Sequence, residues 1–115
     1  MDHDIGGFAA EVSRNDGHAV VAVRGEVDMA TAGQLWTALE AAMDGSPKVE
    51  LDLRATTFMD STGLAVLVKA HQRMGCANDA IVVREPSAAV RKILALAGMD
   101  TLFDLRDGDG SEVIR

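Results

Sequence analysis

Three adjacent polar residues, Asp60, Ser61 and Thr62, have the clearest chemical potential in this chain. They stand where a buried strand is expected to end and an apolar helix to begin. The first turn of a helix leaves backbone N–H groups unpaired, and these groups can donate hydrogen bonds to a phosphate carried by a nearby hydroxyl. The simpler alternative is that Asp60 or Ser61 only caps the helix. The sequence therefore predicts either a phosphorylation switch or an ordinary helix cap.

Neighbouring residues favour more than a cap. Gly63 falls inside the first helical turn, where glycine costs about 1 kcal/mol relative to alanine. That cost suggests that something approaches the backbone closely. Phe58 and Met59 precede the polar residues, and one of them is expected to be exposed in a contact patch. On chemistry alone, a switch and a cap remain equally open.

Enzymatic use of Ser61 is not expected, because a nucleophilic serine needs a base within hydrogen-bonding distance. His71 lies ten residues further along the same expected helix, about 15 Å away at ~1.5 Å per residue. It continues the apolar face, so a packed or partly exposed structural histidine is expected. Nothing places His3 or His18 near Ser61, and the acidic residues beside His3 would hold a metal only loosely. Since a phosphate-binding glycine loop is also absent, we expect no enzyme, no metal and no cofactor.

Composition and charge disfavour several partners and locations. The formal net charge is −7, and the aromatic residues are three Phe and one Trp. This balance opposes binding to nucleic acid and to anionic membrane surfaces. Cys76, the single cysteine, cannot form an intrachain disulfide. No apolar run is long enough to span a bilayer, and the acidic N-terminus is unlike a secretory signal. We therefore expect a cytoplasmic protein.

Hydrophobic periodicity predicts the elements that position the polar residues. Alternating or short apolar runs predict strands at 8–13, 18–24, 49–53, 81–83 and 102–105. Apolar residues at helical spacing predict helices that begin after a capping box at Thr31 and Gln34, within the polar group, and after an N-cap at Ser87. The stretch 54–59 is expected to be a loop that leads to the polar residues.

The order of these elements, β-β-α-β-α-β-α-β, predicts an α/β domain whose mixed sheet of four to five strands is covered by helices. The first two strands should be antiparallel through a tight turn at 15–17, and the later strands parallel through right-handed crossovers. A single domain is expected over 1–115, with its core at about 6–106 and a frayed tail at 107–115.

Three segments, in this order, carry a resemblance to a known family. They are Gly-Glu-Val-Asp at 25–28, Phe-Met-Asp-Ser-Thr-Gly-Leu at 58–64, and Leu-Ala-Gly-Met-Asp-Thr-Leu-Phe at 96–103. Together they resemble a STAS domain, specifically a bacterial anti-sigma factor antagonist. The resemblance covers most of the chain, and the Asp-Ser-[Ser/Thr]-Gly-Leu core with these flanks is specific.

The resemblance implies a partner-switching protein. Such antagonists bind an anti-sigma factor that is also a serine kinase, and the kinase phosphorylates the serine that matches Ser61. A serine phosphatase reverses the reaction, and the unphosphorylated form sequesters the anti-sigma factor and frees the sigma factor. Thr62 is the second choice for the modified residue, while Thr56 and Thr57 are further hydroxyls nearby. Asp28 matches an acidic family position close to the serine.

The expected partner-binding residues are Asp28, Met59, Asp60, Ser61, Thr62 and Gly63. The helix N-terminus would stabilise a phosphate on Ser61, whereas the neighbouring carboxylates would repel it. Two other roles stay open. Some STAS domains are subunits of lipid or anion transport assemblies. Alternatively, a pocket at Ser61 could bind a small molecule or nucleotide, so that the protein acts as a sensor.

Overall fold

The computed structural model describes residues 7–15, 17–76 and 80–106, so the acidic residues around His3 and the expected frayed tail lie outside the described residues. The described residues form five strands and three helices in the predicted order. They are β1 (Ala9–Asn15), β2 (His18–Val27), α1 (Ala32–Met43), β3 (Val49–Met59), α2 (Ser61–Arg73), β4 (Ile81–Arg84), α3 (Ala88–Leu96) and β5 (Asp104–Arg106).

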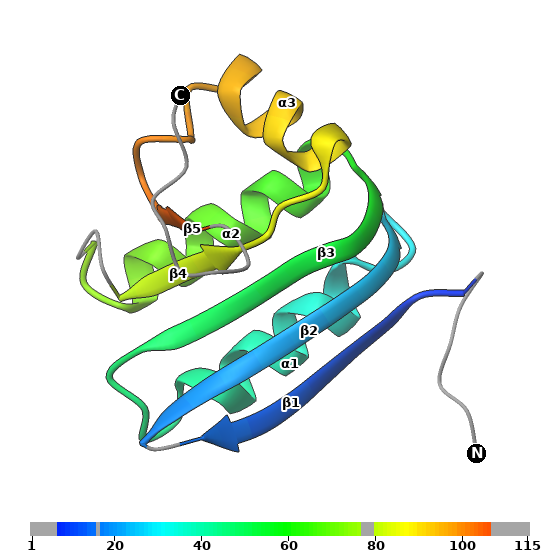
Figure 1. Ribbon diagram of the computed structural model, residues 1–115. Helices are drawn as coiled ribbons and strands as arrows, with labels where there is room; N and C mark the ends of the chain where they lie inside the picture. The colour runs from blue at the N-terminus through cyan, green and yellow to red at the C-terminus, as the bar shows by residue number, and fades with distance from the viewer. Residues whose placement is uncertain (1–6, 16, 77–79, 107–115) are drawn as a thin grey trace.

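The five strands lie side by side in chain order and form one mixed sheet (Figure 1). β1 and β2 are antiparallel, and their register brings Asn15 opposite His18 across the predicted tight turn. The pairs β2–β3, β3–β4 and β4–β5 are all parallel. The predicted α/β class and mixed sheet are therefore confirmed.

The core lies between the sheet and the helices. Along β3, Val49, Leu51 and Leu53 are fully buried, as are Ala19 and Val21, the register partners of Val49 and Leu51 in β2. α1 and α2 contact each other and run side by side behind the strands (Figure 1). Val90 and Leu94 of α3 join the same core. The helices thus bury the apolar side of the alternating strand pattern.

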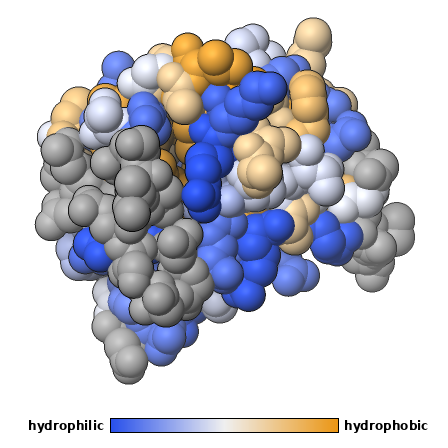
Figure 2. All heavy atoms as spheres, turned by 45° about the horizontal axis from the view of Figure 1, so that its top comes forward, coloured by the Kyte–Doolittle hydropathy of each residue, from blue (hydrophilic) through white to orange (hydrophobic). Residues whose placement is uncertain are grey.

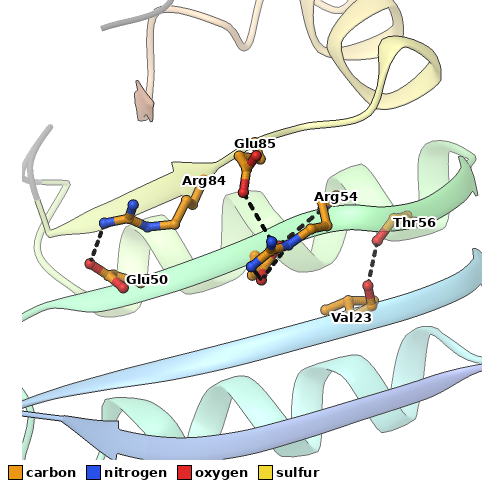
Figure 3. Close-up of polar contacts among 7 residues, drawn as sticks. Val23, Glu50, Arg54, Thr56, Arg84 and Glu85 are labelled. Carbon is orange, nitrogen blue, oxygen red and sulfur yellow. Dashed lines mark hydrogen bonds and ion pairs between the residues drawn. The ribbon is translucent and has the colours of Figure 1, made fainter. Parts of the chain in front are cut away.

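Charged side chains occupy the other side of β3 and β4, in front of the strands in Figure 3. Arg84 pairs with Glu50 at 3.1 Å. Arg54 donates to Asp52 at 2.9 Å and pairs with Glu85, which follows β4, at 3.3 Å. These ion pairs are partly exposed, so each is expected to stabilise the fold only weakly. They explain why charged residues alternate with buried ones along β3.

The predicted loop at 54–59 is wrong, because β3 continues to Met59. β2 also runs further than predicted, to Val27, and the two strands stay paired to their ends. Two register irregularities interrupt this pairing and break the simple alternation of buried and exposed residues. Thr56 is buried in the extension and donates its hydroxyl to the Val23 carbonyl at 3.1 Å (Figure 3).

The helix ends follow the predictions with one exception. Ser87 caps α3, since its hydroxyl accepts from the Val90 N–H at 3.3 Å. α1 begins directly after Thr31, but the predicted capping box is wrong. The Thr31 hydroxyl instead donates to the Glu26 carbonyl at 2.8 Å and accepts from the Asp28 N–H at 3.0 Å. The Thr31 hydroxyl therefore stabilises the loop before α1 and does not cap this helix.

Few large hydrophobic side chains of the described residues are exposed. In the view of Figure 2, hydrophobic residues form small patches separated by hydrophilic ones. Among the described residues, four large hydrophobic side chains are substantially exposed: Val12, Met29, Phe58 and Leu96. Isolated exposed hydrophobic residues are normal, so their positions matter more than their number.

Candidate functional site

The predicted polar residues lie at the carboxyl ends of two neighbouring parallel strands. The register pairs Val27 of β2 with Met59 of β3. The Asp60 N–H donates to the Val27 carbonyl at 3.1 Å. Asp28 and Asp60 therefore leave the sheet at the same level, with their backbones about one strand spacing apart, roughly 4.8 Å. In open α/β sheets, this edge is where binding sites form.

Asp60 is the N-cap of α2. Its Oδ1 accepts from the Thr62 N–H at 2.9 Å and from the Gly63 N–H at 3.4 Å. The Thr62 hydroxyl donates to the same oxygen. This hydroxyl, followed by the two N–H groups, lowers the pKa of Asp60 against the opposing effect of burial. The cap is thus provided by Asp60, which leaves Ser61 without a capping role.

Ser61 is the first residue of α2, and its side chain is exposed. Within 7–15, 17–76 and 80–106, no residue hydrogen-bonds to its hydroxyl. The other hydroxyls nearby differ from it. Thr62 is engaged by Asp60, and Thr56 is fully buried. Thr57 is exposed but lies within β3, four residues before the start of the helix. Ser61 therefore combines accessibility with a position at a helix N-terminus.

The glycine of the site is required by packing inside the protein. A Cβ on Gly63 would lie 2.6 Å from Cγ of Met59 and 2.8 Å from Cγ1 of Val27. The predicted close approach to the backbone is present, but the approaching atoms belong to the chain itself. Because Met59 is only 2% exposed and Gly63 is also buried, neither lies on the surface expected to contact a partner. Phe58, at 46% exposure, is the exposed member of the Phe58–Met59 pair.

Asp28 lies beside this helix start, in a loop that its own side chain organises. Its Oδ1 accepts from the Ala30 N–H at 2.9 Å and lies 3.3 Å from the Thr31 hydroxyl oxygen. Met29, which lies between Asp28 and Ala30, is 83% exposed. Sequence reasoning did not identify Met29. The available signal was an apolar residue directly after a strand-ending aspartate, where no periodic pattern requires one.

Other chemistries have little support at this edge. His71 is buried and packs edge-on against Phe103, with ring centroids 5.5 Å apart, as expected of a structural histidine. His18 begins β2, at the opposite end of the strand from Asp28, and its Nε2 lies 3.5 Å from Glu50. The described part of the chain brings together no three His, Cys, Asp or Glu side chains that could hold a metal ion. None of its helices is long and apolar enough to cross a membrane.

Comparisons with known proteins agree on one family. A family model described as "Mlab, STAS domain" matches residues 10–106. The anti-sigma-F factor antagonist RsfB of Mycobacterium tuberculosis is 33% identical, covering 82% of this chain and 77% of its own length. An anti-sigma-B factor antagonist of Listeria monocytogenes is 26% identical, with 84% and 86% covered.

Solved structures give the same picture. An anti-sigma factor antagonist from Mycobacterium paratuberculosis superposes with a TM-score of 0.76 at 33% identity, covering 85% of this chain and 84% of the other. The anti-sigma factor antagonist SpoIIAA in its unphosphorylated form gives a TM-score of 0.73 at 18% identity, with 87% and 88% covered. At that lower identity, the likeness concerns the fold alone.

Proposed function

Because the chain belongs to the STAS domain family, we propose that it acts as an anti-sigma factor antagonist and not as an enzyme. The names of its relatives support this role. The observation that carries the proposal is the Ser61 hydroxyl, which is exposed at the start of α2 while the neighbouring Asp60 performs the capping. A residue that neither caps nor packs can be modified without loss of the fold.

The proposed mechanism is a partner switch controlled by phosphorylation. In its unphosphorylated form the protein binds an anti-sigma factor that is also a serine kinase. Phosphorylation of Ser61 by that kinase releases it, and a serine phosphatase restores binding. The exchange takes place in the cytoplasm, and it requires neither nucleic acid nor a membrane as a partner of this chain.

Electrostatics support release by a phosphate. A phosphate adds roughly −1.5 to −2 charges at pH 7. The segments 25–33 and 55–68, which flank the site, contain Glu26, Asp28 and Asp60 but no Lys or Arg. The N–H groups of Thr62 and Gly63 already donate to Asp60. A partner covering Ser61 would therefore have to bury a poorly compensated charge, which costs several kcal/mol.

That cost has the right size for a switch. Changing a complex from 99:1 to 1:99 needs about 5.5 kcal/mol of differential affinity. Because α2 is already formed and capped, the phosphate acts on the interface and does not need to refold the domain. The switch acts only at the interface. Phosphorylation is expected to weaken binding because the residues next to Ser61 are acidic.

The modified residue can be identified directly. Each anti-sigma factor kinase encoded in the same genome is incubated with the protein and ATP, and the phosphorylated residue is mapped by mass spectrometry. We expect one kinase to phosphorylate Ser61, with the reaction abolished in Ser61→Ala and retained in Thr62→Val. Phosphate on Thr62 in the wild-type protein would overturn the assignment of Ser61. If every kinase failed to bind or modify the protein, the antagonist role would be wrong.

A second candidate comes from the family resemblance, because some STAS domains are subunits of lipid or anion transport assemblies. The matching family model carries the description Mlab, which differs from the antagonist names of the individual relatives. In this alternative the chain is a soluble subunit of a lipid or anion transport assembly. It would then co-purify with a transport permease and bind no anti-sigma factor kinase, so the same binding experiment separates the two roles.

A further inference from the structure

Met29 is the most exposed large hydrophobic residue of the described chain, at 83%. It lies two residues after Val27, whose register partner is Met59, and Phe58 lies one residue before Met59. Two of the four exposed hydrophobic side chains thus flank the end of β2 and β3 that carries Ser61. The other two, Val12 and Leu96, lie on β1 and at the end of α3.

The loop that carries Met29 is held firmly. The Asp28 N–H donates to the Thr31 hydroxyl at 3.0 Å, and that hydroxyl donates to the Glu26 carbonyl at 2.8 Å. The Ala30 N–H donates to the Asp28 carboxylate at 2.9 Å. Thr31 itself is only 3% exposed. The backbone on both sides of Met29 is therefore fixed, so binding through this side chain would order little besides the side chain itself.

The two sequence segments that contain Met29 and Ser61 carry charge of one sign. Glu26 is exposed, and Asp28 and Asp60 are half-buried. The segments 25–33 and 55–68 contain no Lys or Arg that could neutralise them. An exposed methionine within an acidic surface is poorly suited to an anionic or purely apolar partner. It is suited to a basic protein surface with an apolar hollow, and methionine adapts readily to such hollows.

We propose that Met29 is the apolar anchor of the partner-binding surface and contributes to the choice of partner. The matching partner surface has an apolar socket for the Met29 side chain and Lys or Arg side chains that face Glu26 and Asp28, while the part that covers Ser61 carries no cation to pair with a phosphate. This inference rests on the proposed antagonist function and adds to it a residue outside α2. In this arrangement Ser61 controls whether the partner binds, and Met29 contributes to the choice of partner.

The test measures the affinity of the full chain for the anti-sigma factor kinase that phosphorylates Ser61. Isothermal titration calorimetry is used, and ATP is left out. Met29→Gln should weaken binding at least about tenfold, as expected for a buried anchor, while Met29→Leu should stay within about threefold of the wild type. Leu96→Gln is the matched control, because Leu96 is a 78% exposed hydrophobic residue at the end of α3. It should bind within about twofold of the wild type. Thermal unfolding of each variant shows whether the fold is kept.

The possible outcomes are distinct. If Met29→Gln binds as tightly as Leu96→Gln, the anchor role is overturned while the antagonist function stands. If Met29→Leu loses as much affinity as Met29→Gln, an apolar socket is contradicted. If no anti-sigma factor kinase binds the wild-type protein, the proposed function fails, and the inference fails with it.

Discussion

At the scale of single residues, one carboxylate organises the site. Asp60 accepts hydrogen bonds from the backbone of Thr62 and Gly63 and from the Thr62 hydroxyl. Replacing an N-cap aspartate by alanine typically costs about 1 kcal/mol. We predict a loss of this size for Asp60→Ala at neutral pH, measured as the free energy of unfolding in urea.

The same cap predicts a pH dependence. The hydrogen bonds lower the pKa of Asp60 below its ordinary value of 3.8. Stability that comes from a lowered carboxylate pKa is fully present above the unfolded-state pKa and is lost as the pH falls through the folded-state pKa. The stability difference between wild type and Asp60→Ala should therefore be constant near neutral pH and shrink below about pH 3.8. A difference of equal size at neutral and strongly acidic pH would contradict the charged cap.

Replacement of two different glycines by alanine should change the stability of the domain in opposite directions. A Cβ at Gly63 would clash with Met59 and Val27, whereas a Cβ at Gly33, in α1, would meet no atom within 4 Å. Gly63→Ala should destabilise the domain by about 1–3 kcal/mol, as overpacking does. Gly33→Ala should stabilise it by up to about 1 kcal/mol, because alanine favours the helix. Urea unfolding of both variants checks the pair, and equal effects would show that the packing around Gly63 is relaxed.

At the scale of elements, the first helix depends on a strand for its C-terminal cap. α1 has no basic residue in its last turn. Arg14 of β1 supplies one, donating to the Ala41 carbonyl at 2.8 Å and to the Ser46 hydroxyl at 2.7 Å. A cation there satisfies carbonyl groups and favours the helix dipole.

Replacement of Arg14 should therefore loosen the contact between β1 and α1. We predict that Arg14→Ala lowers the free energy of unfolding by about 0.5–1 kcal/mol, a modest effect because the contact is largely exposed. Arg14→Lys should recover part of this loss, since it keeps the charge but not the forked geometry. If Arg14→Lys is as unstable as Arg14→Ala, charge at the helix end contributes nothing.

The elements also show what periodicity in the sequence can predict. Strands such as Val49–Leu53 and the buried faces of the helices follow from regular apolar spacing. The end of β3 was not predicted, because register irregularities remove the alternation there. Thr56 makes the strand harder to predict, since a polar side chain is not expected in the core. It can be buried there because it donates a hydrogen bond to Val23 in another strand. Such long-range partners are not visible in a local pattern.

At the scale of the whole molecule, the fold positions the site through parallel pairing. The carboxyl ends of β2 and β3 bring Asp28 and Asp60 together, although the two residues are far apart in the sequence. The Asp-Ser-Thr-Gly motif predicts a candidate site, and the fold places this motif at the start of α2, beside the end of β2. The motif was not sufficient to predict the surface of the site, since Met59 is buried and Met29 is exposed. Exposure of a loop side chain depends on the packing of the whole domain.

The whole domain should tolerate the phosphate. Ser61 is exposed at the start of a helix, where negative charge is favourable. We predict that stoichiometric phosphorylation of Ser61 leaves the far-UV circular dichroism spectrum unchanged. The midpoint of thermal unfolding should move by less than about 4 °C, the shift given by ~1 kcal/mol in a small domain. Loss of helical signal on phosphorylation would mean that the switch works by unfolding.

The central claim is that a phosphate on Ser61 determines whether the partner binds. The most direct measurement is the affinity of the anti-sigma factor kinase for the unphosphorylated protein and for the protein phosphorylated on Ser61, with Ser61→Ala and Ser61→Asp alongside. We predict that the phosphate weakens binding on the order of ten thousandfold, or ~5.5 kcal/mol, the difference that changes a complex from 99:1 to 1:99. Ser61→Ala should bind like the unphosphorylated protein even after incubation with ATP, and Ser61→Asp should bind weakly. Equal affinity of the phosphorylated and unphosphorylated proteins would contradict the account.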